Sequence, residues 1–327
     1  MASLPKNKPP HKSVRKHAKR QVDKAVEYLE KTRITDEDVH RSRKALKKAR
    51  ASLRLLRPAL KNVDYRRVNA DLRDAAKPLS SLRDAKVLLD TLQMVVKRHG
   101  LPERALKLDG LKRALGSRRA HVRHDLLGSN GGALAHSRRL LRQSRARIDE
   151  CVSRPQEEWS VIGAGMKRVY SQGRRAFADA RRKSSPEAFH EWRKQAQYLH
   201  YALERLNPLW SGLIGALADQ AHKLADYLGD EHDLTVLRET VLASGDSFSD
   251  EQTLPVLLAL IDRCQTALRE KAIYLGLRLY EERPKIFAAR FGKYWKVSCD
   301  QRMTAPPKSA ALPKASSSDI ARSIATT

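Results

Sequence analysis

A segment that occurs twice in the chain begins Val39-His40-Arg41-Ser42-Arg43-Lys44 and runs on to Pro58. Its second copy begins Phe189-His190-Glu191-Trp192-Arg193-Lys194, runs on to Pro208 and follows the first by 150 positions. The residues common to both copies are His40/His190, Arg43/Arg193, Lys44/Lys194, Leu53/Leu203, Leu56/Leu206 and Pro58/Pro208. A repeat of this length in a chain of 327 residues indicates two duplicated halves.

Both copies carry the start and stop signals of an α-helix. Thr35 precedes three acidic residues, which is typical of an N-cap followed by side chains that favour the positive end of the helix dipole. Ser185 and Pro186 form the corresponding start in the second copy, because proline suits the first helical turn. Pro58 and Pro208 predict the two ends, since the residue before a proline rarely stays helical.

Each repeated helix is expected to have an apolar face and a polar face, since successive residues turn by about 100° around the axis. In the first copy the apolar face holds Leu46, Ala49, Leu53, Leu56 and Leu60, and the basic face holds His40, Arg43, Lys44, Lys47, Arg50 and Arg54. In the second copy the apolar face holds Ala196, Leu199, Leu203, Leu206 and Trp210, and the other face holds His190, Arg193, Lys194, Gln197, His200 and Tyr201. A lone basic face is most simply a solvated surface, but its repetition behind a histidine favours a binding function. For the histidines alone, a structural hydrogen bond explains the pattern as well as ligand contact does.

The composition indicates a polyanionic partner. The formal net charge is +28, with 65 Lys and Arg against 37 Asp and Glu. Such self-repulsion is offset by nucleic acid, an anionic membrane surface or an inorganic polyanion. Hydrophobic residues make up 41% of the chain, enough for a core, whereas aromatic residues are only 6%, few for a protein that stacks nucleic-acid bases.

The cysteines and the hydropathy pattern favour a cytoplasmic protein. Cys151, Cys264 and Cys299 are far apart, which argues against a disulfide framework or a zinc site and fits a reducing compartment. No uninterrupted apolar run reaches the length that crosses a bilayer, so no membrane contact is expected.

The whole chain has the pattern of an all-α protein, without convincing strand alternation. Besides the two repeated helices, helical patterns cover residues 14–31, 62–98, 103–127, 134–152, 159–182, 211–242, 254–280 and a short closing stretch at 285–296. Pro78 is expected to kink or split the second of these. Breaks between Gly128 and Pro155 divide the chain into a first helical bundle at residues 11–150 and a second at 156–300. Residues 1–10 and 301–327 are predicted to be disordered.

A second pair of segments supports the duplication. Leu82-Arg83-Asp84-Ala85-Lys86-Val87-Leu88 matches Glu231-His232-Asp233-Leu234-Thr235-Val236-Leu237 at nearly the same spacing from its own histidine helix. Asp84 and Asp233 are expected to orient a basic or histidine side chain of the preceding helix in the same bundle.

These repeated segments resemble the CHAD family, whose name stands for conserved histidine α-helical domain. In the second half the resemblance rests on residues 189–204 and on Leu228-Gly229-Asp230-Glu231-His232-Asp233-Leu234. In the first half it rests on Val39-His40, Arg43, Lys47-Lys48-Ala49-Arg50 and Leu82-Arg83-Asp84. It covers roughly residues 14 to 290, nearly the whole predicted fold.

The resemblance implies two four-helix bundles related by pseudo-two-fold symmetry. It also implies binding of inorganic polyphosphate by basic residues that line a central groove or pore. Family members often accompany a CYTH triphosphatase domain or sit on polyphosphate granules. This chain has no room for a CYTH domain and no typical Glu-x-Glu-x-Lys run. We therefore expect a binding protein without catalysis, metal or cofactor, at polyphosphate granules in the cytoplasm, with granule-associated proteins as further partners.

The residues predicted to bind polyphosphate are His40, Arg43, Lys44, Lys47, Arg50, Arg54, Arg83, Lys86, Arg174, Arg175, His190, Arg193, Lys194, His200, His222, Lys223 and His232. The second repeat departs from the family pattern, because Gln197 and His200 stand where the family usually has Lys and Arg. The second half is therefore expected to contribute fewer cations.

Three alternative functions remain open from the sequence. A nucleic-acid-binding helical protein would have the same charge, but the low aromatic content and the lack of a known nucleic-acid motif disfavour it. A metal-dependent enzyme is suggested by Glu37-x-x-His40 and Glu187-x-x-His190, which have the spacing of di-iron bundles. These two motifs fall in separate halves among cations, which disfavours a shared metal site. A scaffold for partner proteins is compatible with polyphosphate binding.

Overall fold

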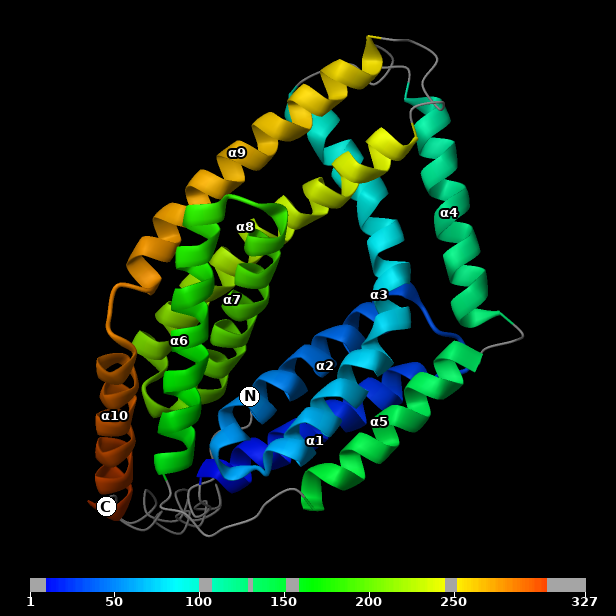
Figure 1. Cartoon of the computed structure of the whole chain (residues 1–327). Helices are drawn as coiled ribbons and strands as arrows, with labels where there is room; N and C mark the ends of the chain where they lie inside the picture. The colour runs from blue at the N-terminus through cyan, green and yellow to red at the C-terminus, as the bar shows by residue number, and fades with distance from the viewer. Residues whose placement is uncertain (1–9, 100–107, 129–131, 151–158, 245–251, 305–327) are drawn as a thin grey trace, which may run out of the picture.

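The computed structural model describes residues 10–99, 108–128, 132–150, 159–244 and 252–304, and these residues form an all-α fold without strands (Figure 1). The α-helices are α1 Pro10–Leu29, α2 Asp36–Leu56, α3 Asn62–Arg98, α4 Asp109–Leu127, α5 Gly132–Glu150, α6 Ser160–Lys183, α7 Pro186–Leu206, α8 Ser211–Ala243, α9 Thr253–Leu279 and α10 Pro284–Thr304. Two 3-10 turns, η1 at Arg57–Ala59 and η3 at Asn207–Leu209, follow α2 and α7. Within the described residues, no helix is apolar enough over a sufficient length to cross a bilayer.

The two repeated segments are the helices α2 and α7, with the predicted caps. The Thr35 hydroxyl accepts a hydrogen bond from the Asp38 backbone N–H at 3.2 Å, and the Asp38 carboxylate accepts one from the Thr35 N–H at 3.0 Å. The Ser185 hydroxyl caps α7 by accepting from the Ala188 N–H at 3.3 Å. Each helix ends one residue before a 3-10 turn that contains the repeated proline, so both predicted ends are confirmed.

The predictions for α3, for α10 and for the two ends of the chain need correction. α3 continues through Pro78 as one helix of 37 residues, because Leu72, Ala75, Leu79 and Leu82 on either side are buried and hold both parts in the same core. The predicted closing helix is longer than expected, since α10 runs to Thr304, past the predicted domain end at residue 300. The segments predicted to be disordered were residues 1–10 and 301–327, but Pro10 begins α1 and residues 301–304 end α10, and the remainder lies outside the described residues.

Trp210 does not belong to the buried face of the second repeat. η3 turns the chain after α7, so Trp210 becomes the N-cap residue of α8, and its side chain is 53% exposed. It contacts the edge of the Tyr294 ring at a centroid distance of 5.1 Å. The other predicted apolar residues of α7 are buried, as are those of α2 itself, whereas Leu60 beyond η1 is half-buried.

The helices pack around three hydrophobic clusters. One lies mainly among α1, α2, α3 and α5, and a second mainly among α6, α7, α8, α10 and the end of α9. The third joins the C-terminal parts of α3 and α8 to α4 and α9. The division at residues 150–156 into two bundles, and their pseudo-two-fold relation, remain predictions. Packing crosses that division, because Leu55 of α2 belongs to the second cluster and the third cluster takes residues from both halves.

Candidate polyanion-binding site

A central cavity of about 210 Å³ lies where α2, α3, α7 and α8 meet. Its lining residues are His40, Arg43, Lys44, Lys47, Arg83, Asp84, Val87, Arg193, Gln197, Tyr201, Ala225, Asp226, Gly229, Asp230 and Asp233. Six of the predicted binding residues are among them, and they come from both halves of the repeat. The cavity is therefore where the first His-x-x-Arg-Lys motif meets Arg193 of the second.

The cations in this cavity act on one another at close range. The Arg43 side chain is only 14% exposed, and its Nη2 lies 3.8 Å from Oδ1 of Asp84. Burial, and after it the neighbouring charges of Arg43, Arg193 and Arg83, lower the pKa of Lys47 to about 7. Keeping these side chains charged therefore costs free energy through desolvation and like-charge repulsion. A bound anion would offset that cost.

Carboxylates on α8 face the same cavity. Asp226, Asp230 and Asp233 follow a spacing of four and three residues, which places them on one side of the helix. Burial raises the pKa of Asp233, although Arg193 and Arg83 oppose that shift. Burial also raises the pKa of Asp230, and the Asp233 charge adds to it. These acids limit the positive potential of the cavity in the free protein.

The prediction for Asp84 is confirmed by its contact with Arg43 on the preceding helix. The charge of Asp233 interacts most strongly with Arg193, which lies on the preceding helix of the same half. It also interacts with the charge of Lys47, which belongs to the other half. Sequence reasoning did not assign Asp226 or Asp230 to the site. The helical spacing of the three α8 carboxylates was the available signal.

A basic groove of about 520 Å³ between α2 and α3 continues from the cavity. Its lining residues are Arg43, Leu46, Lys47, Arg50, Arg73, Asp74, Ala76, Lys77 and Ser80, so Arg43 and Lys47 belong to both hollows. Arg73 and Lys77 were missed from sequence, although they precede Asp84 by eleven and seven positions and so share its side of α3. Lys86 lies in a third hollow, with His40, Arg83 and the acidic start of α2.

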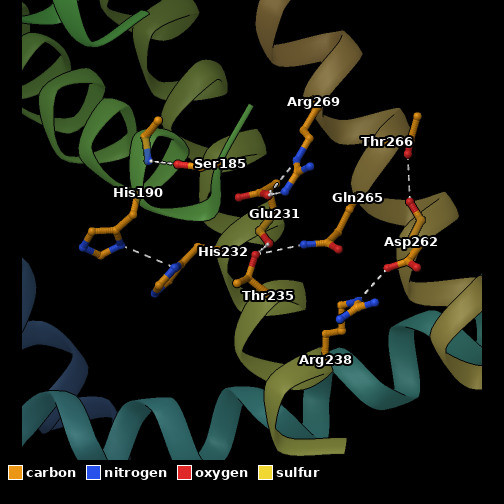
Figure 2. Close-up of polar contacts among 11 residues, drawn as sticks. Ser185, His190, Glu231, His232, Thr235, Arg238, Asp262, Gln265, Thr266 and Arg269 are labelled. Carbon is orange, nitrogen blue, oxygen red and sulfur yellow. Dashed lines mark hydrogen bonds and ion pairs between the residues drawn. The ribbon is translucent and has the colours of Figure 1, made fainter. Parts of the chain in front are cut away.

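The leading histidine of the second repeat forms a pair with another predicted residue. The Nδ1 atoms of His190 on α7 and His232 on α8 are 3.4 Å apart (Figure 2). Burial and then Arg193 lower the pKa of both rings, that of His232 to about 3. The pKa of His40 is lowered as well, by burial and then by Arg83. These three imidazoles are therefore neutral near pH 7 in the free protein.

His200 and His222 form a second pair, on α7 and α8. Their rings stack with centroids 4.5 Å apart, His200 Nδ1 lies 3.1 Å from the carbonyl oxygen of Ala218, and His222 Nδ1 lies 3.3 Å from Oδ1 of Asp226. Burial lowers the pKa of His200. Two further predicted residues have partners of their own, since Lys194 pairs with Glu191 and Lys223 lies over the Tyr227 ring.

The two halves are chemically unequal at matching positions. The pairs along α2 and α7 are Lys47/Gln197, Arg50/His200 and Arg54/Glu204, and those along α3 and α8 are Arg73/His222 and Lys77/Asp226. Apart from Arg43, whose counterpart is Arg193, each cation of the α2–α3 groove has a neutral, titratable or acidic counterpart. The cationic surface is thus concentrated on the first half, with Arg193 as the contribution of the second half to the cavity.

Arg54, Arg174 and Arg175 are also among the predicted residues that line neither the cavity nor the groove. The guanidinium carbon of Arg54 lies 3.8 Å from the Tyr198 ring centroid, at the end of α2. The charge of Arg175 on α6 lowers the pKa of Arg168 beside it. The charge of Arg174 instead lowers the pKa of Tyr170, so Arg174 faces another side of α6.

The glutamates of the two Glu-x-x-His motifs serve the helix starts. Nε of Arg41 donates to Oε1 of Glu37 at 2.7 Å, and Glu187 is exposed in the first turn of α7. Throughout the described segments, no three side chains of His, Cys, Asp or Glu are grouped to hold a metal ion.

Comparisons with known proteins agree with this architecture. A solved structure, "PptA from Streptomyces chartreusis", superposes with a TM-score of 0.58 at 14% sequence identity, over 88% of this chain and 100% of that chain, which shows a shared fold. A search of curated proteins gives no match. The sequence profile described as CHAD domain matches residues 16–242, well over half of the 327 residues. The chain therefore belongs to the CHAD domain family.

Proposed function

We propose that this protein binds inorganic polyphosphate and does not itself catalyse a reaction. The observation that carries the proposal is the convergence of Arg43, Lys47, Arg83 and Arg193 from both halves in one cavity, which opens into the basic α2–α3 groove. A cluster of partly buried cations is costly for a free protein, and a chain of phosphates offsets that cost.

The chemistry of the groove suits a phosphate chain without bases. Guanidiniums can grip phosphate oxygens with two hydrogen bonds, and lysine supplies a mobile point charge. The helices α2 and α3 hold these groups in a fixed row, so successive phosphates can be neutralised without ordering a loop. Release of counterions then favours binding at low salt. Membership of the CHAD family supports the same ligand, and we place the protein at polyphosphate granules in the cytoplasm, where granule-associated proteins would be its partners.

The direct test removes two cavity cations and compares them with two cations elsewhere. The test variant is Arg43→Gln/Lys47→Gln, and the control is Arg263→Gln/Lys271→Gln, which removes two exposed cations from α9. Charge-assisted hydrogen bonds contribute roughly 1.5–3 kcal/mol each, so the test variant should lose at least about tenfold in affinity for long polyphosphate by fluorescence anisotropy. The control should stay within about twofold. Equal losses in both variants would mean that binding is diffuse and the cavity is not the site.

Competition identifies the ligand class. Unlabelled polyphosphate should displace the labelled chain at lower phosphate concentration than single- or double-stranded DNA at the same ionic strength. If DNA competes at lower phosphate concentration than polyphosphate, the proposal is wrong and the ligand is nucleic acid.

A further inference from the structure

A group of arginines lies where α6 of the second half crosses the end of α2 in the first half. The crossing is close, because a Cβ atom added to Gly165 would overlap the carbonyl oxygen of Leu55. Arg54 precedes Leu55 directly, and Arg168 follows Gly165 by less than one helical turn. The backbone contact therefore brings arginines from the two halves together. We call the following four residues the α2–α6 arginine cluster: Arg54, Arg57, Arg168 and Arg175.

Aromatic rings support two of these guanidiniums. The guanidinium carbon of Arg54 is 3.8 Å from the Tyr198 ring centroid, and that of Arg57 is 4.4 Å from the Tyr65 ring centroid. A guanidinium stacked on a ring keeps its N–H edge available for acceptors in the ring plane. Nε of Arg54 is buried without a hydrogen-bond partner in the described part of the chain, and Arg57 Nη2 donates only a long bond of 3.3 Å to Asn62.

The positive charge of the cluster is only partly balanced, because Arg54 lowers the pKa of the Glu191 carboxyl without forming an ion pair with it. None of its four arginines forms an ion pair with a carboxylate of the described residues, unlike Arg142, which pairs with Glu30. The pKa of Arg168 is lowered first by burial and then by the charges of its three arginine neighbours. Like charges held together in this way repel one another, and a bound anion would offset the repulsion.

A row of basic side chains links the cluster to the α2–α3 groove. Its members along α2 and η1 are Arg43, Lys47, Arg50, Arg54 and Arg57. They are spaced alternately by four and three residues, which keeps them on one side of the helix. At 1.5 Å per residue, the row is roughly 21 Å long.

We propose that the α2–α6 arginine cluster is a second phosphate site for the same ligand, where a polyphosphate chain that leaves the α2–α3 groove along α2 is gripped by guanidiniums from both halves. The identity of the ligand rests on the proposed function. The site itself rests on the helix crossing, the stacked arginines and the absence of carboxylate partners in the described segments. The cluster therefore contacts chains long enough to extend past the groove, and a short phosphate bound in the central cavity does not reach it.

The test removes the two members of the cluster that α6 supplies. The variant Arg168→Ala/Arg175→Ala changes two exposed side chains, and Lys167→Ala/Arg181→Ala is the control with two other exposed cations of the same helix. Affinity for tripolyphosphate and for chains of about 100 phosphates is measured at two salt concentrations, with circular dichroism to verify folding. We expect the test variant to lose on the order of tenfold in affinity for the long chain. Its salt slope should also fall by about one to two, because fewer counterions are released.

Binding of tripolyphosphate to the test variant, and all binding to the control, should stay within about twofold of the unmodified protein. Equal loss for test and control, or equal loss for short and long chains, would overturn the second site while leaving the central cavity as the binding site. Absence of any polyphosphate binding by the unmodified protein would overturn the proposed function and the second site together.

Discussion

Lys47 is the residue through which pH acts on the cavity most directly. Its pKa is lowered to about 7 by burial and by the charges of Arg43, Arg193 and Arg83. It therefore gains its charge as the pH falls from 8 to 6, whereas burial lowers the pKa values of His40 and His190, which delays their protonation. Protonation of Asp233, whose pKa is raised, acts in the same direction by removing negative charge.

We expect affinity for long polyphosphate to rise several-fold as the pH falls from 8 to 6 at constant ionic strength. Bound phosphate favours the charged ammonium, so binding near pH 7.5 should take up protons, which calorimetry in buffers of different ionisation enthalpy measures. Lys47→Arg keeps the charge at every pH in this range and should flatten the profile. Long chains are used because their terminal phosphates, which titrate in the same pH range, are then only a small fraction of the ligand. An unchanged profile in Lys47→Arg would assign the pH dependence to other groups.

A second prediction at the scale of one residue concerns a carboxylate of α8. Asp233→Asn removes a negative charge beside Arg193 and Lys47 while keeping the shape of the side chain. We expect polyphosphate to bind several-fold more tightly, since one source of repulsion is gone and two cations lose a competing partner. Asp219→Asn, at an exposed position of the same helix, is the matched control and should change affinity by less than twofold. Weaker binding by Asp233→Asn would show that this carboxylate positions Arg193 for the ligand.

At the scale of the helix, Gly165 sets the distance between α6 and α2. A Cβ atom there would overlap backbone atoms of Leu55, which cannot move aside as the tip of a side chain can. Gly165→Ala should therefore lower the free energy of unfolding by about 1–3 kcal/mol, as overpacking does. Gly116→Ala is the control, because nothing lies within 4 Å of its added Cβ in α4. That control should be stabilised by roughly 0.5–1 kcal/mol through helix propensity. Thermal or urea unfolding of both variants distinguishes the two signs, and a stabilised Gly165→Ala would contradict the close crossing.

The helices were largely predictable because their signals are local. Thr35 and Ser185 cap the N-termini of α2 and α7, and Pro58 and Pro208 follow their last turns. The spacing of the apolar residues predicts which side of each helix is buried. The errors came from tertiary packing. Pro78 stays inside one helix because the core residues on both sides hold it there. Trp210 faces solvent because a 3-10 turn, which the periodicity does not reveal, reorients the chain before α8.

At the scale of the molecule, the repeat predicted which faces would meet but not which half would carry the charge. His40, Arg43 and Arg193 come together as the duplication implies. Asp226 and Asp230 of α8 and the α3 cations Arg73 and Lys77 were not predicted, because they lie outside the repeated His-x-x-Arg-Lys motif. Contacts between halves, such as the 2.6 Å ion pair of Lys48 with Glu204, depend on how helices cross and have no signature in either repeat alone.

The third hydrophobic cluster makes the two halves interdependent. Leu92 and Val95 of α3 pack with Leu234 and Ile261 of the second half. A chain cut at residue 150 would expose both sides of this cluster to water, at about 25 cal/mol per Å² of apolar surface. We expect residues 1–150 and 156–327, expressed separately, to unfold at clearly lower temperature than the full chain or to associate with each other when mixed. Size-exclusion chromatography and thermal unfolding measure this, and two independently stable monomeric halves would contradict it.

The length of the ligand tests the whole arrangement, because the cavity and the groove share Arg43 and Lys47, and the row along α2 continues from these residues to Arg57. A tripolyphosphate can neutralise only part of this surface, whereas a long chain bound at the cavity presents its next phosphates to the groove as an intramolecular contact of high effective concentration. Chains of about 100 phosphates should therefore bind more tightly than tripolyphosphate even when affinity is expressed per phosphate, which corrects for the number of equivalent starting positions. The dependence of log affinity on log salt should also be steeper, since more cations engage phosphate and release more counterions.

Anisotropy titrations over a series of chain lengths should show affinity rising until the chain spans the cavity and the row of roughly 21 Å, then levelling off per phosphate. Equal affinity for tripolyphosphate and long chains would instead confine the ligand to the central cavity, which residues of both halves line.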